Sequence, residues 1–131
     1  MRRRVVVTGM GIVSPIGNDP GTVWQALMEG RSGTATIRRF DAQDLPSRIA
    51  GEVRAFDATQ YLPTKEARRT DRFVQFAVAA AKEALRSAGL DGTTAFAERT
   101  GVLIGSALGG VETFEQGVET LRTRGPSKVS P

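Results

Sequence analysis

The first candidate for chemistry is a glycine-rich turn near the start of the chain. Gly9 and Gly11 come just after the β-branched residues 5–8, and a strand that ends in Gly-x-Gly is typical of a dinucleotide-binding turn. That motif has a third glycine three positions later, where this chain has Ser14, and Pro15 would occupy the helical turn that binds the pyrophosphate. The partial match leaves a nucleotide site as an alternative. The simpler interpretation is a glycine turn after a strand.

The second candidate is a cluster of basic residues in the middle of the chain. Lys65, Arg68 and Arg69 are spaced at i, i+3 and i+4, which places three cations on one face of a helix. Arg72 extends the same cluster. The pattern fits either a docking surface for an acidic partner or an ordinary solvated helix face, and by itself it favours the solvated face.

Two absences limit the chemistry that the chain can perform. It contains no cysteine and no histidine, which excludes a thiol nucleophile, a disulfide framework, a zinc site of Cys/His type and an imidazole base within this chain. No serine-hydrolase elbow and no P-loop motif occurs either. We therefore assign no catalytic, metal-binding or cofactor-binding residue.

Composition indicates an ordinary globular domain with a basic balance. The chain has 131 residues, of which 40% are apolar and 24% charged, and 18 basic against 14 acidic residues give a net charge of +4. This charge admits a nucleic-acid partner, but the aromatic residues are not interleaved with the arginines as in a stacking platform. No apolar run is long enough for a membrane helix, and the basic start is interrupted too early for a signal peptide. We expect a cytoplasmic protein without a membrane or nucleic-acid partner.

The elements that position these residues alternate between strands and helices, which predicts an α/β fold. Strands are expected at 4–8 and 100–106, with a short one at 49–54, and helices at 20–29, 65–69, 71–88 and 111–122. The helix at 71–88 has the clearest apolar periodicity and many alanines, which permit close approach of a neighbour. Asn18 or Asp19 is placed to cap the first helix, Asp71 to cap the long helix, and Gly89 to end it in a left-handed conformation. Two clear strands are few for a parallel sheet, so the chain has the pattern of the first part of a larger domain, without an internal boundary over 1–131.

Taken in order, these motifs resemble the amino terminus of the β-ketoacyl-acyl-carrier-protein synthases, in particular the synthase II group of type II fatty-acid synthesis. The resemblance covers nearly the whole chain. It is carried by RRVVVTGMGIVSPIG at 3–17, WQAL at 24–27, GRSG at 30–33, FD at 40–41, KEARRTD at 65–71, GVLIGSALGG at 101–110 and GPSKVSP at 125–131.

The resemblance implies a thiolase-like α/β/α layered fold, of which this chain is the incomplete amino-terminal part. It implies a homodimeric enzyme without a cofactor that joins an acyl thioester to malonyl-acyl carrier protein by decarboxylative condensation. In that family the nucleophilic cysteine and two histidines lie beyond the region matched here. The chain alone is therefore expected to be inactive.

Some non-catalytic roles follow from the resemblance, position by position. Lys65, Arg68 and Arg69 match the basic helix that docks the acidic carrier protein, and Lys128 matches a second basic position. Ser127 departs from the family, which often has a basic residue there. Leu108 matches an apolar residue that gates the acyl pocket, and an apolar gate suits an alkyl chain because its movement strands no polar group.

Three alternatives remain beside this reading. A type II polyketide ketosynthase or its catalytically silent chain-length-factor partner shares the same amino-terminal pattern. A nucleotide-binding Rossmann-type dehydrogenase domain and a basic nucleic-acid-binding module come from other classes. Ser14 and Pro15 argue against the dehydrogenase, and the clustering of cations on one short helix argues against the nucleic-acid module.

Overall fold

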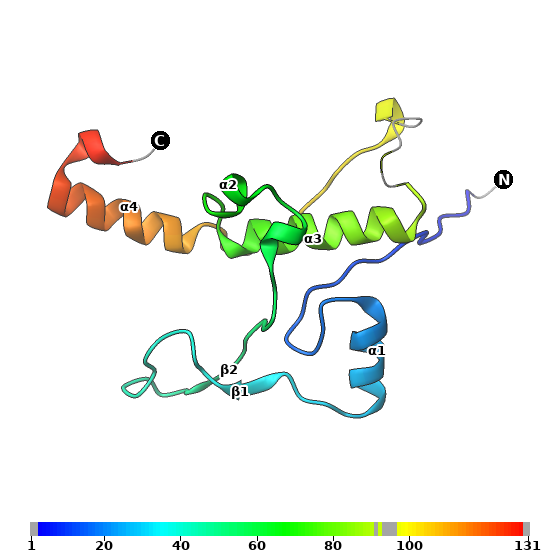
Figure 1. Cartoon of the computed structure of the whole chain (residues 1–131), viewed down its shortest axis with the longest axis horizontal. Coiled ribbons are helices and arrows are strands. Elements are labelled where there is room, and N and C mark those ends of the chain that lie inside the picture. Colours follow the sequence, from blue (N-terminus) through cyan, green and yellow to red (C-terminus); the bar gives the residue numbers. More distant parts are fainter. Residues whose placement is uncertain (1–2, 91, 93–96, 130–131) are drawn as a thin grey trace.

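The computed structural model describes residues 3–90, 92 and 97–129 as a succession of helices with one small sheet (Figure 1). The elements are α1 (Pro20–Met28), β1 (Thr34–Thr36), β2 (Ile49–Gly51), the 3-10 turn η1 (Ala58–Gln60), α2 (Thr64–Ala67), α3 (Arg72–Ser87), η2 (Ala97–Arg99), α4 (Val111–Arg124) and η3 (Pro126–Lys128). In Figure 1, α3 lies at the centre, α4 leads away from its N-terminal end, and α1 and the β1–β2 pair lie below it. No helix in these described ranges is long and apolar enough to cross a bilayer. Residues 130 and 131, which end the last family motif, lie outside the described ranges.

Helix α1 begins and ends where the sequence predicts. The Asp19 carboxylate accepts hydrogen bonds from the backbone N–H and the hydroxyl of Thr22, at 2.9 and 2.6 Å, so Asp19 rather than Asn18 is the N-cap. These bonds, the hydroxyl bond above all, lower the pKa of Asp19. Gly30 follows the helix with a φ of 65°.

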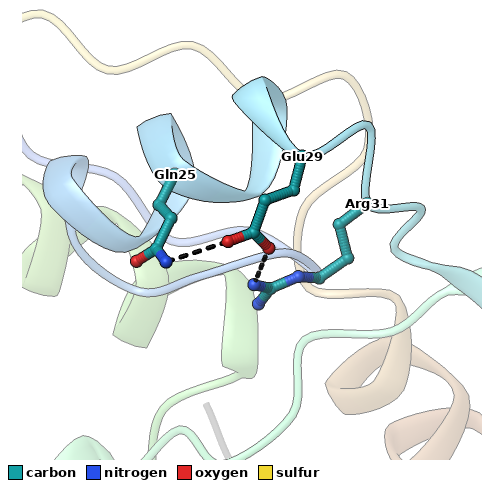
Figure 2. Close-up of polar contacts among 3 residues, drawn as sticks. All are labelled: Gln25, Glu29 and Arg31. Atoms are coloured by element: carbon teal, nitrogen blue, oxygen red, sulfur yellow. Dashed lines mark hydrogen bonds and ion pairs between the residues drawn. The ribbon is translucent and has the colours of Figure 1, made fainter.

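A polar contact joins the end of α1 to the chain that follows (Figure 2). The Glu29 carboxylate accepts from the guanidinium of Arg31 and, at 2.9 Å, from the Gln25 amide. The Arg31 bond first, then that from Gln25, lowers the pKa of Glu29. All three side chains are exposed, so this contact lies on the surface and does not form an enclosed binding site.

Helix α3 is contacted by η1 and by the loop glycines Gly9, Gly11 and Gly109. Its predicted range of 71–88 is confirmed, and Gly89 takes the expected left-handed φ of 69°. Asp71 stands at the N-cap position but makes no side-chain cap bond. Its carboxylate instead accepts from the Thr113 hydroxyl at 2.5 Å, which ties the start of α3 to the first turn of α4.

The expected strands at 4–8 and 100–106 are wrong for this structure. Both segments are irregular, and the sheet formed by the described residues is a two-stranded antiparallel pair of β1 and β2, with Ala35 opposite Ala50. The predicted strand at 49–54 is confirmed only over Ile49–Gly51. Branched apolar residues favour extended backbone, but a strand also needs a hydrogen-bonded neighbour, and neither segment has one among the described strands.

Much apolar surface remains uncovered. The chain exposes 10975 Å², against about 6,700 Å² for a compact monomer of its 14.0 kDa. Within the described part, the buried apolar residues are Val23, Ala26, Ala42 and Ala79. Leu103 is 99% exposed and Trp24 65%. The apolar residues of 100–108 lie exposed, whereas those of α3 are only partly uncovered.

Candidate functional site

The predicted helix at 65–69 is α2 only as far as Ala67, so Lys65 lies on the helix and Arg68 and Arg69 lie on the turn that follows it. Helix α2 starts after Pro63, whose carbonyl accepts from the backbone N–H groups of Glu66 and Ala67 at 2.9 Å. The chain continues in helical turns through Arg68 and Arg69. Lys65, Arg68 and Arg69 are all exposed, and no carboxylate of the described residues lies within ion-pair distance of them. Their charge is therefore available to a partner.

Contacts with α3 hold this basic turn in place. The side-chain amide of Gln75 donates to the carbonyls of Ala67 and Thr70, at 2.8 Å each, so the end of the turn is fixed to the first turns of α3. On the other side, the Lys82 ammonium donates to the Tyr61 carbonyl at 2.6 Å. The backbone that carries the cations is thus held by hydrogen bonds, which reduces the conformational entropy lost when a partner binds.

Two of the three cations also border an open hollow of about 600 Å³. Arg68 and Arg69 share its rim with Arg39 and Arg72, and Asp71 and Glu112 are the acidic residues that line it. Sequence reasoning placed Arg72 beside the cluster but missed Arg39. Arg39 and Arg69 are 30 positions apart in the sequence, and no periodic signal predicts that they lie together, so only the fold shows that they are neighbours.

Lys128 does not join the cluster within this chain. It ends η3, which contacts α4, whereas α2 contacts η1. Figure 1 shows η3 at the far end of α4, well separated from α2. The chain therefore presents Lys128 as a separate basic position.

Leu108 lies between the irregular segment 100–106 and α4, and it is 78% exposed. It is not among the residues that line four hollows on the described part of the chain, the one beside α2 included. The neighbouring Gly109 packs on the ring of Phe73, where an added Cβ would lie 2.7 Å from a ring carbon. The backbone beside Leu108 is thus placed against α3, while its own side chain faces open space.

The glycine-rich turn has a packing role in place of the nucleotide role. A Cβ at Gly9 would lie 2.3 Å from the Ala84 carbonyl oxygen, and one at Gly11 would lie 1.9 Å from the Ala80 carbonyl oxygen. Neither glycine has a left-handed φ, so close approach to α3, and not a tight turn, requires them. The glycines meet the flank of a helix, whereas a dinucleotide turn opens onto a helix N-terminus. This geometry does not support the Rossmann alternative.

An apolar hollow of about 470 Å³ lies beside the same turn. Met10, Trp24 and Leu27 form part of its lining. Trp24 and Leu27 lie on α1 and are exposed, so this hollow is open to solvent. No group of His, Cys, Asp or Glu side chains suited to a metal ion occurs in the described ranges.

Comparisons with known proteins show the family to which the chain belongs. Residues 2–131 match the family model described as "Beta-ketoacyl synthase, N-terminal domain". The chain is 48% identical over 130 residues to the 3-oxoacyl-[acyl-carrier-protein] synthase 2 of Vibrio harveyi, and 49% identical over 130 residues to that of Synechocystis. Each match covers 99% of this chain and 31% of the relative.

Solved structures show the same relation. A β-ketoacyl synthase from Burkholderia phymatum superposes with a TM-score of 0.80 at 30% identity, over 99% of this chain and 32% of that one. A ketosynthase solved in complex with its type II polyketide acyl-carrier protein superposes with a TM-score of 0.77 at 27% identity, over 100% and 35%. The fold is thus the amino-terminal part of a thiolase-like α/β fold. The chain belongs to the β-ketoacyl synthase family, as its amino-terminal domain.

Proposed function

We propose that this chain works as the amino-terminal part of a condensing enzyme of fatty-acid synthesis, a 3-oxoacyl-acyl-carrier-protein synthase. The observation that carries the proposal is the 48% identity to such a synthase through 99% of the chain. The reaction breaks the carbon–carbon bond to the malonyl carboxylate and releases CO2. The electron pair left on the malonyl thioester attacks the acyl thioester carbon, and the enzyme's cysteine thiolate leaves.

This chain supplies none of the reacting groups, since it has no cysteine and no histidine. The nucleophile and the imidazoles that assist decarboxylation belong to the remainder of such an enzyme. The match covers only 31% of the relative's length, so most of the relative lies outside it. In the proposed enzyme, this chain recognises the carrier and forms the mouth of the acyl pocket. The enzyme is a cytoplasmic homodimer, and residues 1–131 are inactive on their own.

Lys65, Arg68 and Arg69 are the proposed docking residues for the carrier protein, with Lys128 as a further contact. Three exposed cations on one braced turn suit an acidic protein surface, because charge complementarity speeds encounter and sets orientation more than it adds affinity. Leu108 is the proposed gate of the acyl pocket. Its 78% exposure leaves it free to pack against groups contributed by the remainder of the enzyme.

A polyketide ketosynthase or its chain-length-factor partner is the second candidate. The ishigamide ketosynthase/chain length factor superposes with a TM-score of 0.77 over 100% of this chain, which favours this class. Its 31% identity is well below the 48% of the fatty-acid enzymes, so the fatty-acid assignment is preferred.

The test is the condensation itself in the full-length protein. The protein is incubated with an acyl-loaded carrier and malonyl-carrier, and mass spectrometry follows the carrier-bound products. We expect one 3-oxoacyl product extended by two carbons. Repeated extension without reduction indicates the polyketide class. The absence of any condensation or CO2 release by the folded protein overturns the assignment. The isolated chain 1–131 serves as the inactive control.

A further inference from the structure

The hollow beside α2 is bordered by four arginines, two of which do not belong to the basic cluster of Lys65, Arg68 and Arg69. Arg39 and Arg72 come from other parts of the chain and face the same space as Arg68 and Arg69. The two acidic residues in the lining, Asp71 and Glu112, leave the hollow with a positive balance. The Asp71 carboxylate also accepts a hydrogen bond from the Thr113 hydroxyl.

Both additional arginines are positioned by consecutive residues at the exit of β2. The Glu52 carboxylate accepts from the backbone N–H of Arg38 and of Arg39, at 3.1 to 3.2 Å. The next residue, Val53, accepts from the Arg72 guanidinium through its carbonyl at 3.2 Å. The Arg39 side chain therefore starts from a backbone held by Glu52, and the Arg72 guanidinium is itself anchored.

Arg72 is partly buried and lies near the positive charge of Arg39. Its guanidinium lies 4.9 Å from the centre of the Phe76 ring. Burial, and then the positive charge of Arg39, lower the pKa of Arg72, while Glu112 acts in the opposite direction. An anion between the two arginines would relieve their repulsion, and a guanidinium offers the paired N–H donors that a carboxylate matches.

The geometry points to a carboxylate of the acidic carrier protein as the occupant of this hollow, bound by Arg39 and Arg72 as an extension of the α2 docking surface. The hollow is open and continuous with Arg68 and Arg69, so one partner bound to α2 covers both. This inference rests on the proposed function, because it takes the carrier as that partner.

The experiment measures carrier affinity in the full-length protein by fluorescence titration at low and high salt. Arg39→Gln is the test variant, since Arg39 is exposed and its side chain makes no hydrogen bond or ion pair found among the described residues. Arg38→Gln is the matched control, because Arg38 is the adjacent exposed arginine and does not line the hollow. Arg68→Gln reports on the α2 surface itself.

We expect Arg39→Gln to weaken carrier binding about threefold to tenfold at low salt, with a smaller loss at high salt. Arg38→Gln should change affinity less than twofold, and the thermal midpoints should be unchanged. Equal affinities for Arg39→Gln and Arg38→Gln, with a loss in Arg68→Gln, overturn this inference and leave the proposed function standing. Unchanged affinity in all three variants overturns the docking assignment as well. Saturable binding of inorganic phosphate that Arg39→Gln abolishes, with carrier affinity intact, assigns the hollow to a small anion and also overturns the inference.

Discussion

Replacement of Gly11 by alanine tests why the glycine-rich turn exists. The added Cβ would lie 1.9 Å from the Ala80 carbonyl oxygen, whereas real Cβ atoms essentially never approach below 3.0 Å. The turn and α3 must therefore separate by about 1.1 Å. The obstructing atom belongs to helical backbone and cannot rotate away as a side chain does. Overpacking of this kind costs about 1–3 kcal/mol, and a backbone obstruction belongs at the upper end, so we expect a loss near 3 kcal/mol.

The matched control is Gly117→Ala within α4. A Cβ at Gly117 meets no atom within 4 Å, and Gly117 does not have a left-handed φ. Alanine in a helix interior is favoured over glycine by about 1 kcal/mol, so this variant should be as stable as the parent or more so. Urea unfolding of the full-length protein, followed by circular dichroism, gives both free-energy changes from the shift in midpoint.

The result that refutes the packing argument is an unchanged midpoint for Gly11→Ala. If that variant kept its stability and instead lost a measurable affinity for NAD(P), the glycines would serve a nucleotide after all. A loss of stability in Gly11→Ala together with a gain or no change in Gly117→Ala supports close helix packing as the reason for glycine at position 11.

Three further outcomes are expected in the full-length protein. Charge reversal of Arg68 and Arg69 to glutamate should weaken carrier binding tenfold or more at low salt, with the fold intact. The same reversal at Arg122 on α4 should leave carrier binding unchanged. Equal carrier affinities of the parent and the Arg68/Arg69 variant at low salt would contradict the docking role. Leu108→Ala should shift the chain-length profile of the acyl products, measured by mass spectrometry, and an unaltered profile argues against a gate. The backbone N–H bonds, that of Arg38 first, hold the pKa of Glu52 below its ordinary value of 4.5. Its contribution to stability is therefore present above that pH and is lost as the pH falls through the folded-state pKa. The stability difference between the parent and Glu52→Gln, measured by urea unfolding at pH 7 and pH 3, should shrink in acid; a constant difference would exclude this linkage.

Helix positions were predictable because their determinants are local. The Asp19 cap, the left-handed Gly89 and the apolar periodicity of α3 each act within a few residues along the chain. The strand predictions at 4–8 and 100–106 failed for the opposite reason. Branched residues mark a segment as extended, but pairing depends on a neighbour that is distant in sequence.

The candidate site likewise has one part that follows from local sequence spacing and one part that depends on contacts distant in sequence. The i, i+3, i+4 spacing predicted Lys65, Arg68 and Arg69 on one face of a helix; in the structure all three are exposed, Lys65 on α2 and the two arginines directly after it. The role of that turn in carrier docking remains a prediction. Arg39 was missed because its approach to the cluster depends on the Glu52 carboxylate, which holds the turn at 38–39 from across the β1–β2 pair.

The amino-acid sequence alone determined the family, the helices and the lack of a thiol or imidazole, since these depend on residue identity and short-range spacing. Only the tertiary structure decided that Gly9 and Gly11 serve close contact with α3, that Lys128 stands apart from α2, and that four arginines share one hollow. The physical reason is that steric exclusion and charge repulsion act through space, between residues whose separation along the chain carries no periodic signal.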